Sequence, residues 1–195
     1  MMTSLCHELL VSSAVQAVPT TDRGSTMGQA DDQLSMDLGV EQTEWGKWVD
    51  PERQAAQVRK FLKHAGLDRL PPDLWPEDSL ELQQLNDICR ELFPDPDTPY
   101  LPENQDMTDA FVCFLGACFV KYVGGEWVDH TEYGPDRSFY AGEVVPALRY
   151  VDYDGDEDDS TVFDYIDSMI DHNIKYGDGF IHITADLRRK YYNLM

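Results

Sequence analysis

The sequence predicts an α+β protein in which helices pack on a small, mainly antiparallel sheet. Several segments carry apolar residues at helical spacing, and short runs rich in β-branched and aromatic residues follow them, separated by Gly and Pro. Hydrophobic residues make up 42% of the 195 residues, enough to bury the core of one ordinary domain. We therefore expect a single α+β domain over residues 41–195 and a disordered tail over residues 1–40.

The predicted tail mixes Ser, Thr, Gly, Gln and Asp without periodicity, so ordering it would cost more entropy than its contacts recover. Its apolar stretch over residues 9–17 is similar to part of a signal peptide, but no Lys or Arg precedes Arg23. We expect a cytoplasmic protein with reduced thiols. The sequence leaves open whether translation begins at Met1, Met27 or Met36.

Two amphipathic helices are predicted at the start of the domain. Residues 51–65 form the first, because Asp50 is a good N-cap and Pro51 suits the first helical position. Residues 79–93 form the second, whose apolar stripe ends at a proline-rich stretch that cannot continue a helix.

A third helix, capped by Asp106 or Thr108, is predicted to lie at the centre of the core. Residues 110–120 are an unbroken apolar run, which belongs inside a core and is too short for a membrane span of about 20 residues. The small residues Ala110, Gly116 and Ala117 are expected to let neighbouring backbones approach closely. The Gly124-Gly125 pair ends this helix, because glycine accepts the left-handed conformation of a C-terminal cap.

Three strands are predicted after this helix, over residues 126–128, 138–140 and 144–151. Trp127 on the first is expected to anchor the core. Pro146 within the third indicates an edge strand or a bulge, because proline cannot donate a ladder hydrogen bond.

The C-terminal third is predicted to hold an acidic helix, a strand and a closing helix. Residues 152–171 contain nine carboxylates and no Lys or Arg, yet their apolar residues recur at helical spacing, which favours an amphipathic acidic helix. Residues 180–183 alternate as in a strand, and residues 186–194 read as a short helix. In that strand, His182 points away from the two Ile beside it, toward solvent or a partner.

No arrangement of residues in the sequence predicts catalysis, a cofactor or a metal site. The five histidines and four cysteines follow no ligand spacing, and no Gly-rich phosphate loop is present. The acidic run from Asp152 is similar to a calcium loop, but Glu157 stands where the turn needs Gly and Phe163 where a bidentate Glu belongs. Weak cation binding stays open, as does an enzyme or metal site assembled from distant residues such as His130 and His182.

The net charge of -22 disfavours direct binding to nucleic acids, whose phosphates need Lys and Arg. The same charge attracts proteins with a basic surface, although it also serves solubility. We predict that the chain docks a basic protein partner, with Tyr side chains among the carboxylates adding apolar contact area. The predicted partner-binding residues are Asp152, Tyr153, Asp154, Asp156, Glu157, Asp158, Asp159, Asp164 and Tyr165.

Two other functions remain open from the sequence. Carboxylates on a rigid helix imitate phosphate spacing, so the chain is alternatively a nucleic-acid mimic that blocks a DNA- or RNA-binding protein. The other alternative is the enzyme or metal protein with a dispersed site. The sequence gives no indication of a small-molecule ligand.

Residues 115–120 (Leu-Gly-Ala-Cys-Phe-Val), followed by residues 124–128 (Gly-Gly-Glu-Trp-Val) and preceded by residues 79–85, resemble a small bacterial α+β module. This module occurs in uncharacterised proteins and in immunity-type proteins of bacterial toxin systems. The resemblance covers about residues 45–150. It implies a central helix that leads into a Gly-Gly-x-Trp hairpin and a non-enzymatic protein, and it carries over no site residues.

Overall fold

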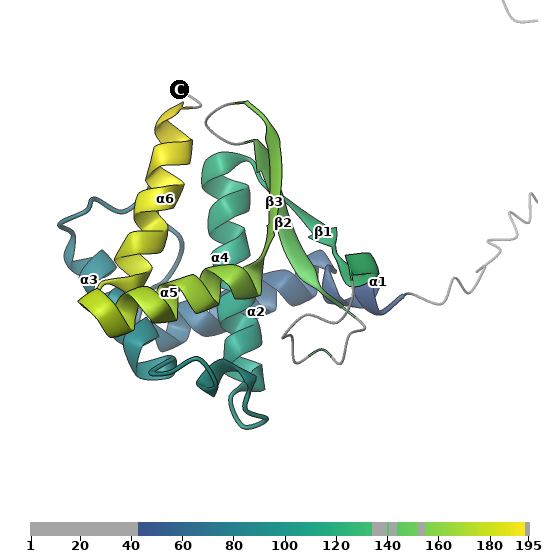
Figure 1. The fold of residues 1–195 in the computed structure, drawn as a ribbon, viewed down its shortest axis with the longest axis horizontal. Coiled ribbons are helices and arrows are strands. Elements are labelled where there is room, and N and C mark those ends of the chain that lie inside the picture. Colours follow the sequence, from purple (N-terminus) through teal and green to yellow (C-terminus); the bar gives the residue numbers. More distant parts are fainter. Residues whose placement is uncertain (1–42, 134–139, 141–143, 152–154, 194–195) are drawn as a thin grey trace, which may run out of the picture. The chain divides into compact units, whose positions relative to one another are not determined.

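Helices surround a central helix, and a three-stranded antiparallel sheet packs beside it, in the computed structural model shown in Figure 1. The structure describes residues 43–133, 140, 144–151 and 155–193, which belong to one compact unit over residues 40–195. The predicted tail over residues 1–40 lies outside the described residues. The predicted α+β class is confirmed. The elements are α1 (Glu44–Trp48), α2 (Pro51–His64), α3 (Leu80–Leu92), the 3-10 turn η1 (Thr98–Tyr100), α4 (Gln105–Val123), β1 (Glu126–Asp129), the 3-10 turn η2 (Thr131–Tyr133), β2 (Pro146–Val151), β3 (Glu157–Thr161), α5 (Val162–Tyr176) and α6 (Gly179–Asn193).

The 19-residue helix α4 is the centre of the core, as its apolar run predicts. Phe111 and Phe114 are fully buried, and the ring centroid of Phe61 from α2 lies 4.4 Å from that of Phe114. The N-cap prediction for α4 is wrong. Thr108 is buried inside the helix and donates its hydroxyl to the Pro99 carbonyl, while Asp106 lies in the first turn. Within the described residues, no helix has the length and hydropathy of a membrane span.

The first two amphipathic helices, α2 and α3, form where the sequence predicts them. The Asp50 carboxylate accepts hydrogen bonds from the backbone N–H groups of Glu52 and Arg53, both at 3.0 Å. The Ser79 hydroxyl accepts one from the N–H of Leu82 at 3.2 Å. These bonds satisfy backbone donors that have no partner inside the helix.

The sheet has the order β1-β2-β3, so β2 is its central strand. The prediction that Pro146 marks an edge strand or a bulge is therefore wrong. Pro146 is the first residue of β2, paired opposite Asp129, and proline is tolerated at the first position of a strand. Of the predicted strand over residues 138–140, only Tyr140 is among the described residues, and it does not belong to a strand.

Gly116 and Trp127 fix how the sheet packs on α4. A Cβ atom at Gly116 would lie 1.9 Å from Cζ2 of Trp127, so only glycine leaves room for the indole ring. The ring also packs edge-on against Trp48, with ring centroids 4.9 Å apart. At Gly116 the close neighbour is the Trp127 side chain, whereas the sequence predicts the approach of a backbone. The left-handed Gly124 that ends α4, at φ +68°, is confirmed.

Two predictions for the C-terminal third are wrong. The described part of residues 152–171 is not one helix, because residues 157–161 form strand β3 and pair with β2, and α5 begins only at Val162. Residues 180–183 are not a strand, because they belong to helix α6. Phe180, Ile183 and Leu187 are all buried at helical spacing, a period that extends beyond the four residues on which the strand prediction was based.

The junction between α5 and α6 is held by α3. Buried Asn86 donates its side-chain N–H to the Gly177 carbonyl at 2.9 Å and accepts from the N–H of Phe180 at 3.1 Å. Gly177 is left-handed at φ +80° and ends α5. The sharp connection between α5 and α6 therefore depends on Asn86, a residue that precedes its two bonding partners by 91 and 94 positions in the sequence.

Candidate protein-binding surface

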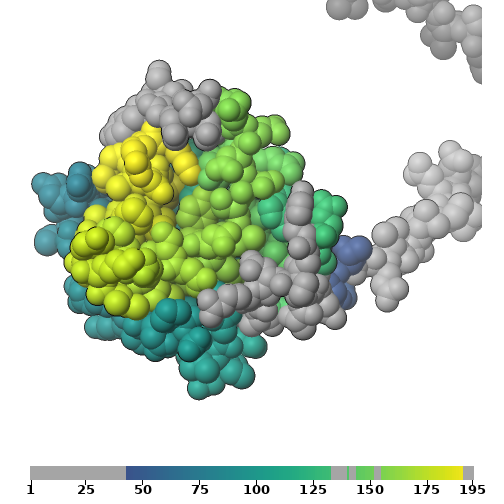
Figure 2. Space-filling model, viewed as in Figure 1, coloured from purple at the N-terminus to yellow at the C-terminus, as the bar shows by residue number. Residues whose placement is uncertain are grey.

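Strand β3 carries the densest group of exposed carboxylates in the described C-terminal third. Glu157, Asp158 and Asp159 follow one another on this strand, and all three are exposed. Within the described residues β3 pairs only with β2, so its other side is an edge of the sheet. Figure 2 shows the view in which the β3, α5 and α6 region faces the reader.

The outer face of the sheet contains an ion-pair row across all three strands. Arg149 on β2 lies opposite Glu126 on β1 and Asp159 on β3, with nitrogen to oxygen distances of 3.9 and 3.5 Å. The Nε2 atom of His130 lies 3.2 Å from the Asp159 carboxylate. Arg149 is the last Lys or Arg in the sequence before Lys175.

On the inner face of β3, Asp158 contacts residues of the same domain. Asp158 accepts a hydrogen bond from the hydroxyl of Tyr150 at 3.0 Å, and that hydroxyl lies 2.8 Å from the hydroxyl of Tyr165. Tyr165 is only 9% exposed, and its ring centroid is 4.7 Å from that of Phe119. Burial, followed by the bond to Tyr150, raises the pKa of Tyr165. Tyr165, predicted to contact a partner, is therefore a core residue in this structure.

The remaining predicted partner-binding residues divide into two groups. Asp156 and Asp164 are exposed, and Asp164 lies in the first turn of α5, where its Oδ2 accepts from the Thr161 hydroxyl at 2.8 Å. Three others lie outside the described residues: Asp152, Tyr153 and Asp154. We define the acidic edge as the five exposed carboxylates that the fold gathers around β3, namely Asp156, Glu157, Asp158, Asp159 and Asp164.

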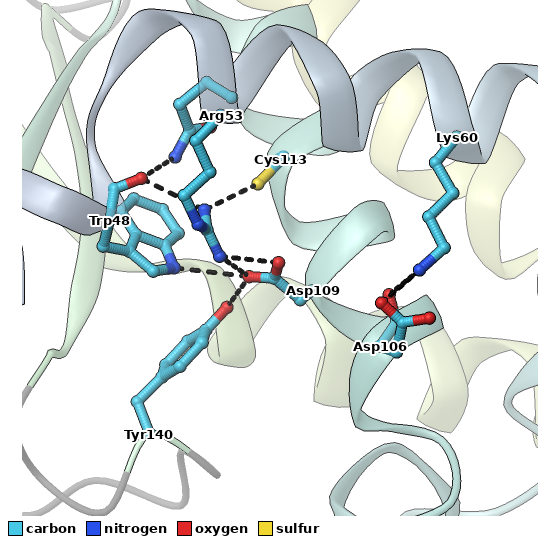
Figure 3. A network of polar contacts seen from close by, with 8 residues as sticks. Trp48, Arg53, Lys60, Asp106, Asp109, Cys113 and Tyr140 are labelled. Atoms are coloured by element: carbon cyan, nitrogen blue, oxygen red, sulfur yellow. Dashed lines mark hydrogen bonds and ion pairs between the residues drawn. The ribbon is translucent and has the colours of Figure 1, made fainter.

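A buried polar network that the sequence analysis missed joins α2 to α4 (Figure 3). The Nη2 atom of Arg53 donates to both carboxylate oxygens of Asp109, at 2.8 and 2.6 Å. The Trp48 indole N–H donates to the same carboxylate at 3.3 Å, and the Tyr140 hydroxyl also donates to it. A carboxylate directly before an apolar helical run was the available sequence signal, because such a group needs a cation once it is buried.

The ion pair between Arg53 and Asp109, together with burial, sets the pKa values of the groups in this network. Burial alone would lower the pKa of Arg53, but its hydrogen bonds to Asp109 and the charge of Asp109 outweigh burial and raise it. Burial, with the Asp109 charge adding to it, raises the pKa of the Cys113 thiol to about 12. Because the thiolate is the nucleophile, Cys113 is unreactive near neutral pH. The network holds two helices together.

The histidines named in the sequence analysis lie in two separate clusters. His182 lies on helix α6 and stacks on His172 of α5, with ring centroids 3.9 Å apart and planes at 9°. The Nδ1 atom of His172 is 2.7 Å from Asp178. His130 lies beside Asp159 instead. Among the described residues, no three His, Cys, Asp or Glu side chains are grouped as metal ligands.

Comparison with protein-family models, with curated proteins and with solved structures found no match for this chain. Its function is therefore inferred from the geometry of its own residues.

Proposed function

We propose that this chain is a non-enzymatic protein-binding module, of the immunity, adaptor or accessory kind, that docks a basic surface of another protein through its acidic edge. The observation that carries the proposal is the position of residues 157–159, which are consecutive exposed carboxylates on an edge strand of the sheet. Complementary charge across an interface speeds encounter and selects among partners.

The rigidity of the acidic edge supports the proposal. Strand β3 pairs with β2 along five residues, and the first turn of α5 directly follows it, capped by Thr161. Carboxylates fixed on such a framework lose little conformational entropy when a partner binds, so more of the electrostatic attraction is retained as affinity. Glu157 forms no ion pair with any other described residue and is available to a partner's Lys or Arg.

Charges on an edge strand also have a simpler effect, because they prevent other strands from pairing with the edge. The two roles differ in what neutral variants do. If the charges only protect the edge, neutral variants aggregate but lose no binding partner. If the acidic edge is a docking surface, they lose affinity for a basic probe while staying monomeric.

The test measures the affinity of a fluorescent Lys-rich peptide by anisotropy at physiological ionic strength. The edge variant carries Asp156→Asn, Glu157→Gln and Asp159→Asn, and it keeps Asp158 because this residue accepts the Tyr150 hydrogen bond. We expect this variant to bind about tenfold more weakly, which corresponds to about 1.4 kcal/mol spread over three rim charges. Its unfolding free energy should change by less than about 0.5 kcal/mol.

The matched control removes the same number of charges elsewhere, with Asp73→Asn, Asp78→Asn and Glu81→Gln. All three residues are exposed and lie before or within the first turn of α3. We expect the control to bind the peptide nearly as the unaltered chain does. Equal losses in the two variants would mean that affinity follows net charge alone, and no loss in the edge variant would exclude the acidic edge as the docking surface.

A further inference from the structure

An apolar groove of about 530 Å³ lies between α2 and α4, with the Trp127 ring as part of its wall. This volume is within the range of small-ligand sites, which bury an apolar body against hydrophobic and aromatic side chains. The residues that give the groove its apolar lining are Val49, Ala55, Val58, Ala117, Val120 and Trp127.

Two cations also line the groove, Arg59 from α2 and Lys121 from α4. Neither forms an ion pair within the part of the chain that the structure describes, although Lys121 lies 5.5 Å from the ring centroid of Tyr122. None of the described residues that line the groove is acidic. In a chain with 37 acidic and 15 basic residues, this local excess of positive charge is unusual.

We propose that the groove binds a long-chain monocarboxylate, with its alkyl chain against the apolar lining and its carboxylate held by Arg59 and Lys121. An apolar groove lined by two cations that have no carboxylate partner among the described residues complements a molecule with one anionic end and an uncharged body. Guanidinium and ammonium groups both form charge-assisted hydrogen bonds with carboxylates. A short polar anion lacks the apolar length, a long-chain dicarboxylate would place a second charge against the apolar lining, and an alkylammonium would be repelled by the two cations.

The apolar lining of the groove leads us to expect a dependence on the length of the alkyl chain. Each methylene moved from water to apolar surroundings changes the affinity about threefold to fourfold. We therefore expect binding to tighten from octanoate to decanoate to dodecanoate. The alkyl chain of the ligand supplies the apolar contribution to affinity, and its carboxylate sets the orientation. The two contributions can therefore be tested separately.

The experiment is isothermal titration calorimetry of the full chain with dodecanoate, below its micelle concentration, and with dodecanol as the uncharged equivalent. The unaltered chain should bind one dodecanoate, more tightly than it binds dodecanol. The charge variant Arg59→Gln/Lys121→Gln should bind dodecanoate at least about tenfold more weakly, because the ligand carboxylate loses its charge-assisted hydrogen bonds from both side chains. Its affinity for dodecanol should not change.

Two further variants serve as controls. Lys63→Gln/Arg69→Gln removes the same charge from exposed positions that do not line the groove, and it should bind dodecanoate as the unaltered chain does. Ala117→Phe places a ring in the groove and should abolish binding of both ligands. Its far-ultraviolet circular dichroism, compared with that of the unaltered chain, shows whether the fold is retained.

Several outcomes would overturn the proposal. Equal dodecanoate affinity in the two double variants, or several equivalent sites per chain, would mean that the alkyl chain binds without the two cations. Tighter binding of an acidic amphipathic peptide, lost with Ala117→Phe, would assign the groove to a protein partner. A dimer in sedimentation that the same substitution dissociates would assign it to a second copy of the chain.

Discussion

Helix α4 and the segment formed by β3 and α5 each contain a long run of one kind of residue, but only the apolar run determined its own structure. The apolar run of α4 had to be buried, and a helix of this length that is buried over most of its surface has one place in a small domain. The acidic run after Asp152 had no such requirement. Solvated carboxylates are compatible with strand, turn or helix, so pairing with β2 decided that residues 157–161 are a strand.

The same comparison holds for single carboxylates. Asp109 has a side chain only 8% exposed and is paired with Arg53, whereas Asp106, one turn earlier on α4, is 80% exposed and pairs with Lys60 at the surface. Both residues are aspartates on α4, and each forms an ion pair with a basic side chain of α2. Burial, together with the hydrogen bonds that Asp109 accepts from Trp48 and Tyr140, separates a carboxylate that the fold needs from one that it tolerates.

The largest expected effect is that of Asp109→Asn. Removing the negative charge leaves Arg53 without its counter-ion and weakens the acceptor for Trp48 and Tyr140. We expect the unfolding free energy to fall by about 3 kcal/mol. This value is at the lower end of the range for breaking a buried ion pair, because the Arg53 side chain is 29% exposed. Urea denaturation measures this loss.

Asp106→Asn is the matched control for that substitution. Its ion pair with Lys60 is exposed, so the change in unfolding free energy should stay within about 0.5 kcal/mol. Similar losses for the two variants would show that burial does not distinguish the two carboxylates.

Gly116→Ala should have the next largest effect. The added Cβ meets the rigid indole of Trp127, which is also held by Trp48, so the ring cannot move without disturbing the sheet. We expect a loss of about 1–3 kcal/mol, the usual cost of overpacking a core, in thermal or chemical denaturation. In a Trp127→Leu background the same substitution should cost much less, and an equal cost in both backgrounds would exclude the clash as its cause.

Of the three substitutions expected to destabilise the chain, Thr161→Ala should have the smallest effect, and its sign tests where α5 begins. Thr161 accepts a hydrogen bond from the N–H of Asp164 as the N-cap, so its loss should destabilise the chain by about 1 kcal/mol. If residues 152–171 formed one helix, position 161 would be internal and alanine would stabilise the chain. Ser168→Ala, at an exposed position inside α5, is the control and should be neutral or slightly stabilising in the same denaturation assay.

The predictions that proved right were those with local physical causes. Asp50, Ser79 and Gly124 mark helix ends through their own side chains or backbone conformation, so the sequence shows them directly. The candidate site was predicted less well. The exposed carboxylates from Asp156 to Asp159 and Asp164 lie where a charged surface was expected, but Tyr165 is buried against Phe119. Tyr165 lies three residues after Val162 and four before Met169, so the helical spacing of these residues was the available sequence signal.

By itself the sequence determined the α+β class, the central helix and the glycine that ends it, the ends of the first two long helices and the acidic character of the C-terminal third. Each follows from residues adjacent in the chain, whose hydrophobicity, capping or backbone freedom acts locally. Only the tertiary structure decided that residues 157–161 join a sheet, that Phe180 lies on the buried face of a helix and that Asp109 meets Arg53. These depend on contacts between segments distant in sequence, where the gain from burial and pairing outweighs the weak local preference of the chain.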